Sequence, residues 1–119
     1  MTEIKKQYDL EERTLKFAKN TRLFIGLLPK TVAVIEDSKQ VVRSSGSVGA
    51  NYIEANESLS QKDFLHRIKI CRKEAKETMC WLELLAPACA SVMEEKRLVL
   101  LQEAKEFMMI FGSIIKKVQ

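Results

Sequence analysis

The sequence has only two prolines and four glycines in 119 residues, and apolar and polar residues do not alternate over any long stretch. Because proline and glycine interrupt helices and alternation is typical of strands, these absences favour long helices over a β fold. Apolar residues make up 46% and charged residues 30% of the chain, which allows a core and argues against disorder. We expect one all-α domain over residues 1–119.

Long apolar runs are also missing. No run approaches the ~18 residues of a membrane span, and the N-terminal stretch MTEIKKQYDLEER lacks the apolar segment of a secretory signal. We therefore expect a cytoplasmic protein with no membrane association. The three cysteines, Cys71, Cys80 and Cys89, fit neither a disulfide framework nor a zinc motif, so we expect buried, reduced thiols.

Residues that carry chemistry are scarce. His66 is the single histidine, and the sequence contains no HExxH, no Glu-x-x-His pair, no phosphate-binding glycine loop and no nucleophile elbow. We therefore predict no catalytic residue, no metal ligand and no cofactor. The net charge of +4 is compatible with an acidic partner without requiring one.

What the sequence does contain is helical periodicity in four segments. In the first, apolar residues and threonines recur at spacings of three and four: Leu10, Thr14, Phe17, Thr21, Phe24 and Leu28. Pairs typical of helix starts precede three segments: Asp9 with Glu12, Ser60 with Asp63, and Ser91 with Glu94. The predicted helices are residues 9–28, 30–56, 61–86 and 92–118. Short connections favour antiparallel neighbours, so we predict an up-down-up-down four-helix bundle.

The stretch VVRSSGSVGANYIEAN, residues 41–56, could be a linker or a helix. The spacing of Ile35, Val42 and Gly49 keeps its helical phase across the stretch, which favours a helix. Gly46 and Gly49 would each cost ~1 kcal/mol relative to alanine. A neighbouring helix with a large side chain over Ser45 and Gly49 would offset this cost. The alternative is a break near Gly46.

A basic stripe follows the third segment on the side opposite its apolar face. Its members are Lys62, His66, Lys69, Lys73 and Lys76, with Arg67 and Arg72 beside them. The stripe fits contacts with phosphates, which depend on charge density. The alternative is a solvated face with intrahelical pairs such as Lys73 with Glu77, and the lack of interleaved aromatic residues for base stacking favours it.

A second polar set lies on one side of the second segment. It consists of Arg43, Ser47, Asn51 and Glu54. These residues are candidates for a hydrogen-bonded subunit contact, with simple solvation as the alternative. Tyr52 and Trp81 carry polar groups that need partners, so each is a candidate for a helix seam or a subunit interface, with core packing as the alternative.

Three stretches resemble a known family: YDLEERTLKFA at 8–18, VRSSGSVGANYIEA at 42–55 and KDFLHRIKICRKEAKETMCWLELL at 62–85. They are similar to the small bacterial, ribosomal-protein-like bundle proteins encoded in intervening sequences of 23S rRNA genes. The residues that match the family pattern are Arg43, Ser47, Asn51, Ile53 and Glu54, followed by Phe64, Ile70 and Glu77. The family usually has glycine where this chain has Ala55.

The resemblance implies a closed four-helix bundle that assembles as a homopentamer. Similar bundles accompany the reverse transcriptases of diversity-generating retroelements and contact nucleic acid there, which suggests an RNA, DNA or nucleoprotein partner. No catalytic residues are known for the family. We therefore expect a non-enzymatic oligomer that associates with nucleic acid through the basic stripe, or alternatively a protein-binding adaptor without nucleic-acid affinity.

Overall fold

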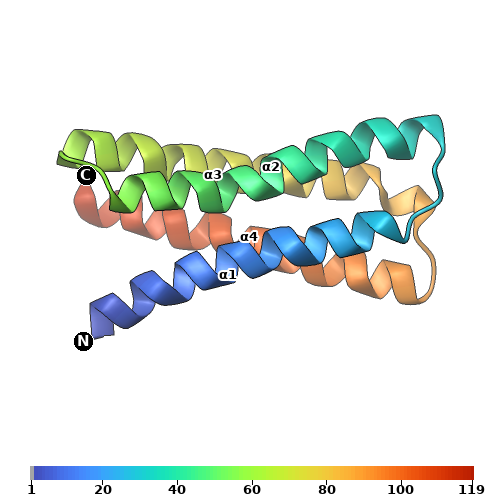
Figure 1. The fold of residues 1–119 in the computed structure, drawn as a ribbon, viewed down its shortest axis with the longest axis horizontal. Helices are drawn as coiled ribbons and strands as arrows, with labels where there is room; N and C mark the ends of the chain where they lie inside the picture. Colours follow the sequence, from blue (N-terminus) through green and yellow to red (C-terminus); the bar gives the residue numbers. More distant parts are fainter. Residues whose placement is uncertain (1) are drawn as a thin grey trace.

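Four long helices make up the fold of the computed structural model, which describes the backbone of residues 2–119 and the side chains of residues 10–119. They are α1 (Thr2–Gly26), α2 (Val32–Asn56), α3 (Gln61–Leu84) and α4 (Val92–Val118), with a short 3-10 turn, η1 (Ala86–Ala88), before α4. Figure 1 shows the chain reversing direction at each connection, so that the helices follow the 44 Å long axis of the molecule. No strand occurs in this part of the chain, and the predicted all-α class with four helices is confirmed.

The helix starts agree only partly with the predicted ones. The helix α1 begins at Thr2, seven residues before the predicted start at Asp9, whose side chain lies outside the described residues. The predicted cap of α3 is confirmed, because the backbone N–H of Asp63 donates to Ser60 Oγ at 3.1 Å. Thr31 caps α2 in the same way, accepting from the N–H of Val34 at 3.3 Å.

The predicted capping pair at the start of α4 is wrong. Ser91 makes no capping hydrogen bond with its side chain, and its backbone lies at φ 51°, a region that non-glycine residues rarely adopt. Glu94 instead accepts two hydrogen bonds of 2.7 Å from Arg97. The turn that follows η1 therefore fixes the entry into α4, and the serine hydroxyl has no part in it.

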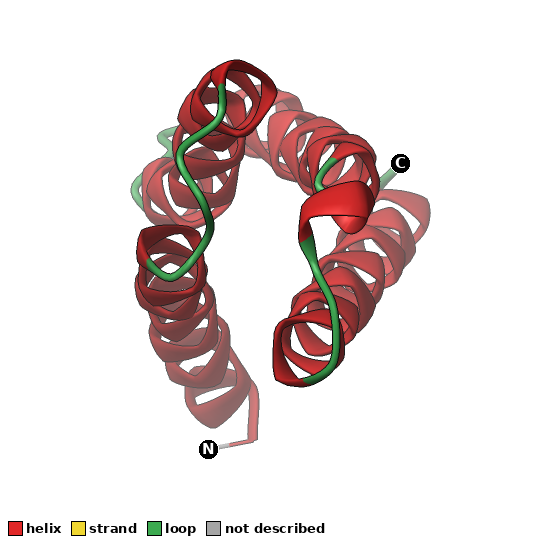
Figure 2. Cartoon of the chain, turned by 90° about the vertical axis from the view of Figure 1, so that its right-hand side faces the viewer, coloured by secondary structure: helices red, strands yellow, loops and turns green. Residues whose placement is uncertain are grey.

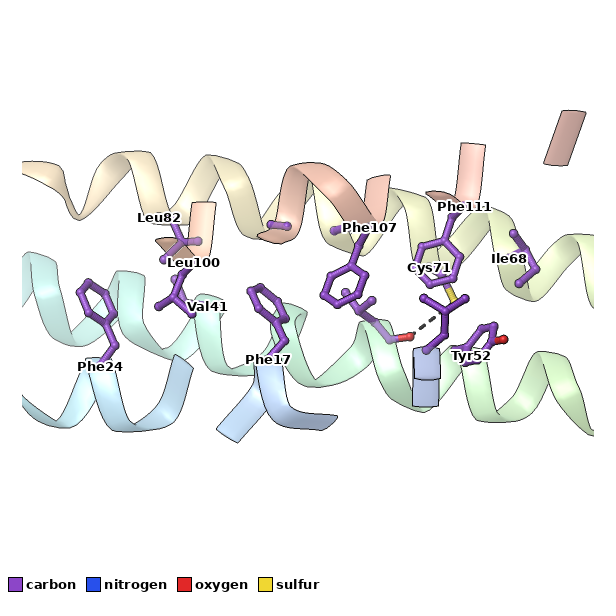
Figure 3. Packing of buried hydrophobic residues seen from close by; sticks show 14 of the residues in the cluster. Phe17, Phe24, Val41, Tyr52, Ile68, Cys71, Leu82, Leu100, Phe107 and Phe111 are labelled. Carbon is purple, nitrogen blue, oxygen red and sulfur yellow. Dashed lines mark hydrogen bonds between the residues drawn. The ribbon is translucent and has the colours of Figure 1, made fainter. Parts of the chain in front are cut away.

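The core runs along the middle of all four helices (Figure 3). The rings of Phe17 and Phe107 meet edge to face with 5.3 Å between centroids, and Tyr52 lies 5.7 Å from Phe111. The six residues of the stripe predicted in the first segment are all buried. None of the helices described is long and apolar enough to cross a bilayer.

The three cysteines differ in their surroundings. Cys71 is buried, and its Sγ donates to the carbonyl oxygen of Val48 at 3.4 Å (Figure 3). Burial raises the pKa of the Cys71 thiol to about 12. Cys89 is half-buried, and Cys80 is exposed, so the prediction of three buried thiols is wrong for these two positions.

The helix α2 continues without a break through the serine- and glycine-rich stretch, as predicted. Its buried face is shifted by one residue from the predicted stripe. Val41 and Val48 are fully buried, whereas Ile35 is 42% exposed. The shift arises because α2 packs against α3 as well as α1, and Ser44 accepts a hydrogen bond from Thr78 Oγ1 across that second contact at 2.8 Å.

Gly49 lies where α1 and α2 approach each other closely. A Cβ atom at this position would be 2.9 Å from Thr14 Oγ1 and 3.2 Å from Thr14 Cβ. The expected close approach is therefore present, but the neighbour over Gly49 is the small Thr14 and not a large side chain. At Gly46, a Cβ would meet only the tip of the Arg22 side chain, at 3.3 Å.

Candidate nucleic-acid interface

The outer side of α3 carries a continuous group of exposed basic side chains. We call this group the basic face of α3; it consists of Lys62, His66, Lys69, Arg72, Lys73 and Lys76. The opposite side of α3 is buried in the core through Ile68, Cys71 and Ala75, so the face has the position that the sequence predicts. Within residues 10–119, no carboxylate forms an ion pair with any of the six.

Arg67 does not belong to the basic face, although it was predicted beside it. Its side chain is turned toward α2, where Nη1 donates to Asn51 Oδ1 at 3.0 Å. The residue is half-buried. Arg67 therefore links two helices, and the basic face has six members where the sequence suggested seven.

Two acidic residues of α3 pair with residues of α2 and not with the basic face. Glu74 is only 6% exposed and accepts hydrogen bonds from Arg43 Nη1 at 3.1 Å and from Ser47 Oγ at 3.3 Å. Glu77 accepts from Arg43 Nη2 and from Trp81 Nε1, the latter at 3.2 Å. The pairing of Lys73 with Glu77 that a solvated face would show is therefore replaced by a pairing of Glu77 with Arg43.

The electrostatics of Glu77 follow from these contacts. Partial burial alone would raise the pKa of Glu77, but hydrogen bonds from Trp81 and Glu74 and the nearby positive charge of Arg43 lower that pKa below its ordinary value. The positive charge of Lys73, one turn earlier in α3, lowers the pKa of Glu77 as well. The Glu77 carboxylate is thus stabilised in its ionised form by groups of both α2 and α3.

These contacts continue into a chain of hydrogen bonds that we call the α2–α3 polar network. Asn51 Nδ2 donates to both the Oγ and the carbonyl oxygen of Ser47, each at 2.9 Å. The members of the network are Arg43, Ser47, Asn51, Arg67, Glu74, Glu77 and Trp81. Three of the four residues predicted as a subunit contact or a solvated face, Arg43, Ser47 and Asn51, thus find partners within their own chain, and a role between subunits stays a prediction.

Tyr52 and Glu54 lie outside this network. Tyr52 is buried in the core beside Phe111 (Figure 3), and burial raises the pKa of its hydroxyl. Core packing, the alternative for Tyr52, is therefore what the structure shows. Glu54 is exposed, and its side chain makes no hydrogen bond with the described residues.

Two exposed lysines lie on the face of α4 that carries Gly112, and the sequence analysis did not single them out. Gly112 of α4 packs beside α3, since a Cβ there would lie 3.9 Å from Arg72 Cδ. Lys105 and Lys116 are exposed and lie seven residues before and four residues after Gly112, on the same face of α4. Their spacing was visible in the sequence, but the contact of this face of α4 with Arg72 of α3 was not.

The charge of the basic face is of the kind that attracts a polyanion. Exposed ammonium and guanidinium groups attract phosphates by charge, and each neutralised phosphate releases counterions. Among the side chains of residues 10–119, no three His, Cys, Asp or Glu residues gather as a metal site would require.

Comparison with known proteins agrees with the resemblance noted in the sequence. Residues 6–113 match the family model of the 23S rRNA-intervening sequence protein. The chain is also similar to the crystal structure of a protein of unknown function from the S23 ribosomal protein family of Bacteroides thetaiotaomicron VPI-5482. The identity is 32%, the TM-score is 0.75, and the match covers 90% of this chain and 98% of the other. No curated protein matches the chain.

Proposed function

Because the chain belongs to the 23S rRNA-intervening sequence protein family, we propose that it is a non-enzymatic helical-bundle protein that associates with RNA or DNA through the basic face of α3. We further propose that it is cytoplasmic, that its helices form an up-down-up-down bundle, and that the bundle assembles as a homopentamer. Its partners would then be other copies of itself together with a nucleic acid or a nucleoprotein.

The separation of charge on α3 is the observation that carries this proposal. The buried Glu74 and the half-buried Glu77 are paired with Arg43, whereas the six basic side chains of the basic face are exposed and form no ion pair among residues 10–119. A face that serves only solubility usually mixes both signs of charge.

Assembly would strengthen such binding. A closed ring of five chains would present the basic face five times on one particle, and linked sites bind a long polyanion far more tightly than one site does. Sequence preference should be slight, because lysines on the outer side of a helix contact phosphates and read no base edges here.

A protein-binding adaptor without nucleic-acid affinity is the second candidate. The observation that favours it is apolar, and it lies elsewhere on the molecule: several large hydrophobic side chains of α1 and α4 are exposed, among them Leu23 and Val99. An adaptor would bind its protein partner through that apolar surface, and its basic face would bind no nucleic acid.

The test is a triple substitution in the basic face: Lys69→Glu, Lys73→Glu and Lys76→Glu. All three side chains are exposed, so helicity and particle mass should stay unchanged. Fluorescence anisotropy with a structured RNA and a DNA duplex, from about 50 to 200 mM salt, should show wild-type binding that weakens steeply with salt. The triple variant should bind at least ten-fold more weakly.

A matched control changes the same net charge on another part of the molecule. Lys19→Glu, Lys30→Glu and Lys39→Glu are exposed positions of α1, α2 and the connection between them, and the control should retain most of the affinity. If wild type fails to bind at 50 mM salt, or if both triple variants bind equally, the basic face is not a nucleic-acid site and the adaptor becomes the better proposal.

A further inference from the structure

An apolar hollow lies on the surface where the chain passes from α1 to α2. We call it the corner hollow, and its apolar lining consists of Ile25, Leu28, Val34, Ile35 and Val42. Figure 2 looks onto the end of the bundle where this connection lies. The volume of the hollow is about 430 Å³, within the range of about 300–1,000 Å³ that is usual for small-molecule sites. The hollow thus has the size and the apolar lining that a small organic molecule needs.

One side chain that lines the corner hollow has a polar atom without a partner. Ser38 is only 8% exposed, and its Oγ atom is buried and forms no hydrogen bond with any residue that the structure describes. Buried hydroxyls are nearly always hydrogen-bonded, because an unpaired one destabilises the fold. Rotation about the Cα–Cβ bond of Ser38, without movement of α2, would let this hydroxyl donate to an oxygen atom in the hollow.

The charged side chains that line the corner hollow are both positive. They are Lys30 and Lys39, which are exposed, and none of the lining residues is acidic. Lys39 forms an ion pair with Glu36 at 3.3 Å, but the two side chains are 67% and 65% exposed. Exposed pairs of this kind are weak, so Lys39 can exchange Glu36 for an anion that is held in the hollow.

The start of α2 adds to the positive potential at this place. The helix begins at Val32, and its first turn contains no acidic residue. The free N–H groups at a helix N-terminus carry a partial positive charge. Val34 belongs to this first turn and also lines the hollow, so an anion bound there would lie near the positive end of the helix.

Other hollows on the described surface have a different lining. The hollow between α1 and α4 is lined by Lys96 together with Glu95, and the hollow near Gly49 is lined by Glu11 and Glu12. The corner hollow instead combines apolar side chains, an unpaired buried hydroxyl and charges of one sign. This combination is what distinguishes a site for an anion from an apolar docking surface.

We propose that the corner hollow binds a small carboxylate with an apolar body, such as a medium-chain fatty acid or an aryl-substituted acid. The apolar body would pack against the apolar lining and leave water. Lys30 and Lys39 would attract the carboxylate, and one of its oxygen atoms would accept a hydrogen bond from Ser38. The inference does not depend on the proposed nucleic-acid binding, because the basic face belongs to α3 and shares no residue with the hollow.

Displacement of a fluorescent dye tests the site. Anilinonaphthalene sulfonate has apolar rings and one negative charge, so its fluorescence should rise when it binds to the wild type, and octanoate should displace it. Octanol has the same chain length without the charge. Displacement by octanol should need a concentration about ten-fold higher, because it lacks the charged hydrogen bonds of the carboxylate.

Two variants locate the binding. Lys30→Gln with Lys39→Gln should abolish the difference between octanoate and octanol. Ser38→Ala should weaken octanoate binding about five-fold and should raise the melting temperature, because it removes a buried hydroxyl without a partner; the loss of a serine that only supports the fold would lower it. The matched control, Lys69→Gln with Lys73→Gln in the basic face, removes the same charge and should leave octanoate binding unchanged.

Three outcomes would overturn the inference. Equal displacement by octanoate and octanol from the wild type would assign the corner hollow to an apolar surface of a protein partner. Unchanged octanoate binding by Ser38→Ala, or equal losses in the two double lysine variants, would place the carboxylate elsewhere on the molecule. A wild type that binds neither the dye nor octanoate would exclude the site altogether. No nucleic acid enters this experiment, so its failure leaves the proposed function unaffected.

Discussion

Thr14 and Gly49 set the distance between α1 and α2. The hydroxyl of Thr14 is buried and donates to the carbonyl oxygen of Leu10 in its own helix at 2.7 Å. Its side chain therefore cannot rotate away without leaving a buried polar group unpaired. At this contact α2 has room only for a residue without a side chain. The close approach of Thr14 therefore explains why a glycine lies in the middle of a helix.

Substitution of the two central glycines should have opposite effects. Gly49→Ala places a Cβ 2.9 Å from Thr14 Oγ1, and such overpacking should cost about 1–3 kcal/mol of unfolding free energy. Gly46→Ala meets only the mobile tip of Arg22 and should stabilise the helix by up to ~1 kcal/mol. Urea unfolding followed by circular dichroism measures both.

Removal of the neighbour provides the internal check. The double variant Thr14→Ala with Gly49→Ala should recover part of the loss, because the clashing oxygen is gone. Equal unfolding free energies for Gly49→Ala and Gly46→Ala would mean that α1 does not approach α2 as closely as 2.9 Å implies.

Hydrogen bonds between residues close together in the sequence could be predicted, and those between distant residues could not. Ser60 caps α3 as predicted because the capping bond joins residues three apart. Ser91 was predicted by the same rule and does not cap, because the turn after η1 holds its backbone at φ 51°. The partners of Arg43 lie 31 and 34 residues away in the sequence, so no local pattern could identify them.

At the scale of elements, the pairing of α2 with α3 depends on Arg43. Its guanidinium is the cation beside the buried Glu74, and it also holds Glu77. A buried carboxylate that loses its cation destabilises the fold, although the 46% exposure of the Arg43 side chain moderates the effect. The α2–α3 polar network therefore stabilises the fold of each single chain.

Arg43→Met should lower the unfolding free energy at neutral pH by about 1–3 kcal/mol, with a clear pH dependence. Because the pKa of Glu77 is lowered in the folded state, its contribution is present above the ordinary carboxyl pKa and is lost as the pH falls through the folded value. The difference between wild type and variant should thus shrink in acid. Urea unfolding between about pH 7 and pH 3 measures it.

Lys39→Met is the matched control in the same helix. Lys39 is exposed and pairs only with the exposed Glu36 at 3.3 Å, so its loss should change the unfolding free energy by less than about 0.5 kcal/mol. A constant difference between Arg43→Met and wild type across this pH range would argue that the carboxylates of α3 do not depend on Arg43.

The buried residues of a helix were predicted best where they form one narrow stripe. They were predicted less well where neighbouring helices cover two different sides. The six residues of the α1 stripe were all predicted correctly because the contacts of α1 with α2 and α4 fall on one narrow face of the helix. The helix α2 contacts both α1 and α3, so its buried residues centre on Val41 and Val48, and the stripe through Ile35 lies at the edge. Periodicity gives the width of an apolar face but cannot say which neighbours share it.

At the scale of the whole molecule, the four helices and their order followed from the sequence. The pairing of Glu74 and Glu77 with Arg43 could not be predicted from the sequence, because it depends on which side of α3 packs against α2. Leu23 stands outside the stripe predicted for the first segment, and it is 70% exposed. Helical phase thus separated this leucine from the core, but it could not show how closely α4 approaches α1.

The exposed apolar surface between α1 and α4 has a consequence for the order in which the molecule unfolds. The helix α1 contacts α4 through Phe17 and Arg13, but Leu23 of α1 and Val99 of α4 stay exposed between the two helices. The helices α2 and α3, by contrast, are joined by the buried hydrogen bond from Thr78 to Ser44 and by the part-buried bond from Arg43 to Glu74. Local opening starts where few buried contacts must break. Amide hydrogen exchange followed by mass spectrometry should therefore show α1 residues 20–26 exchanging before α3 residues 68–82. A partner that covers the apolar surface between α1 and α4 should slow exchange in α1 most.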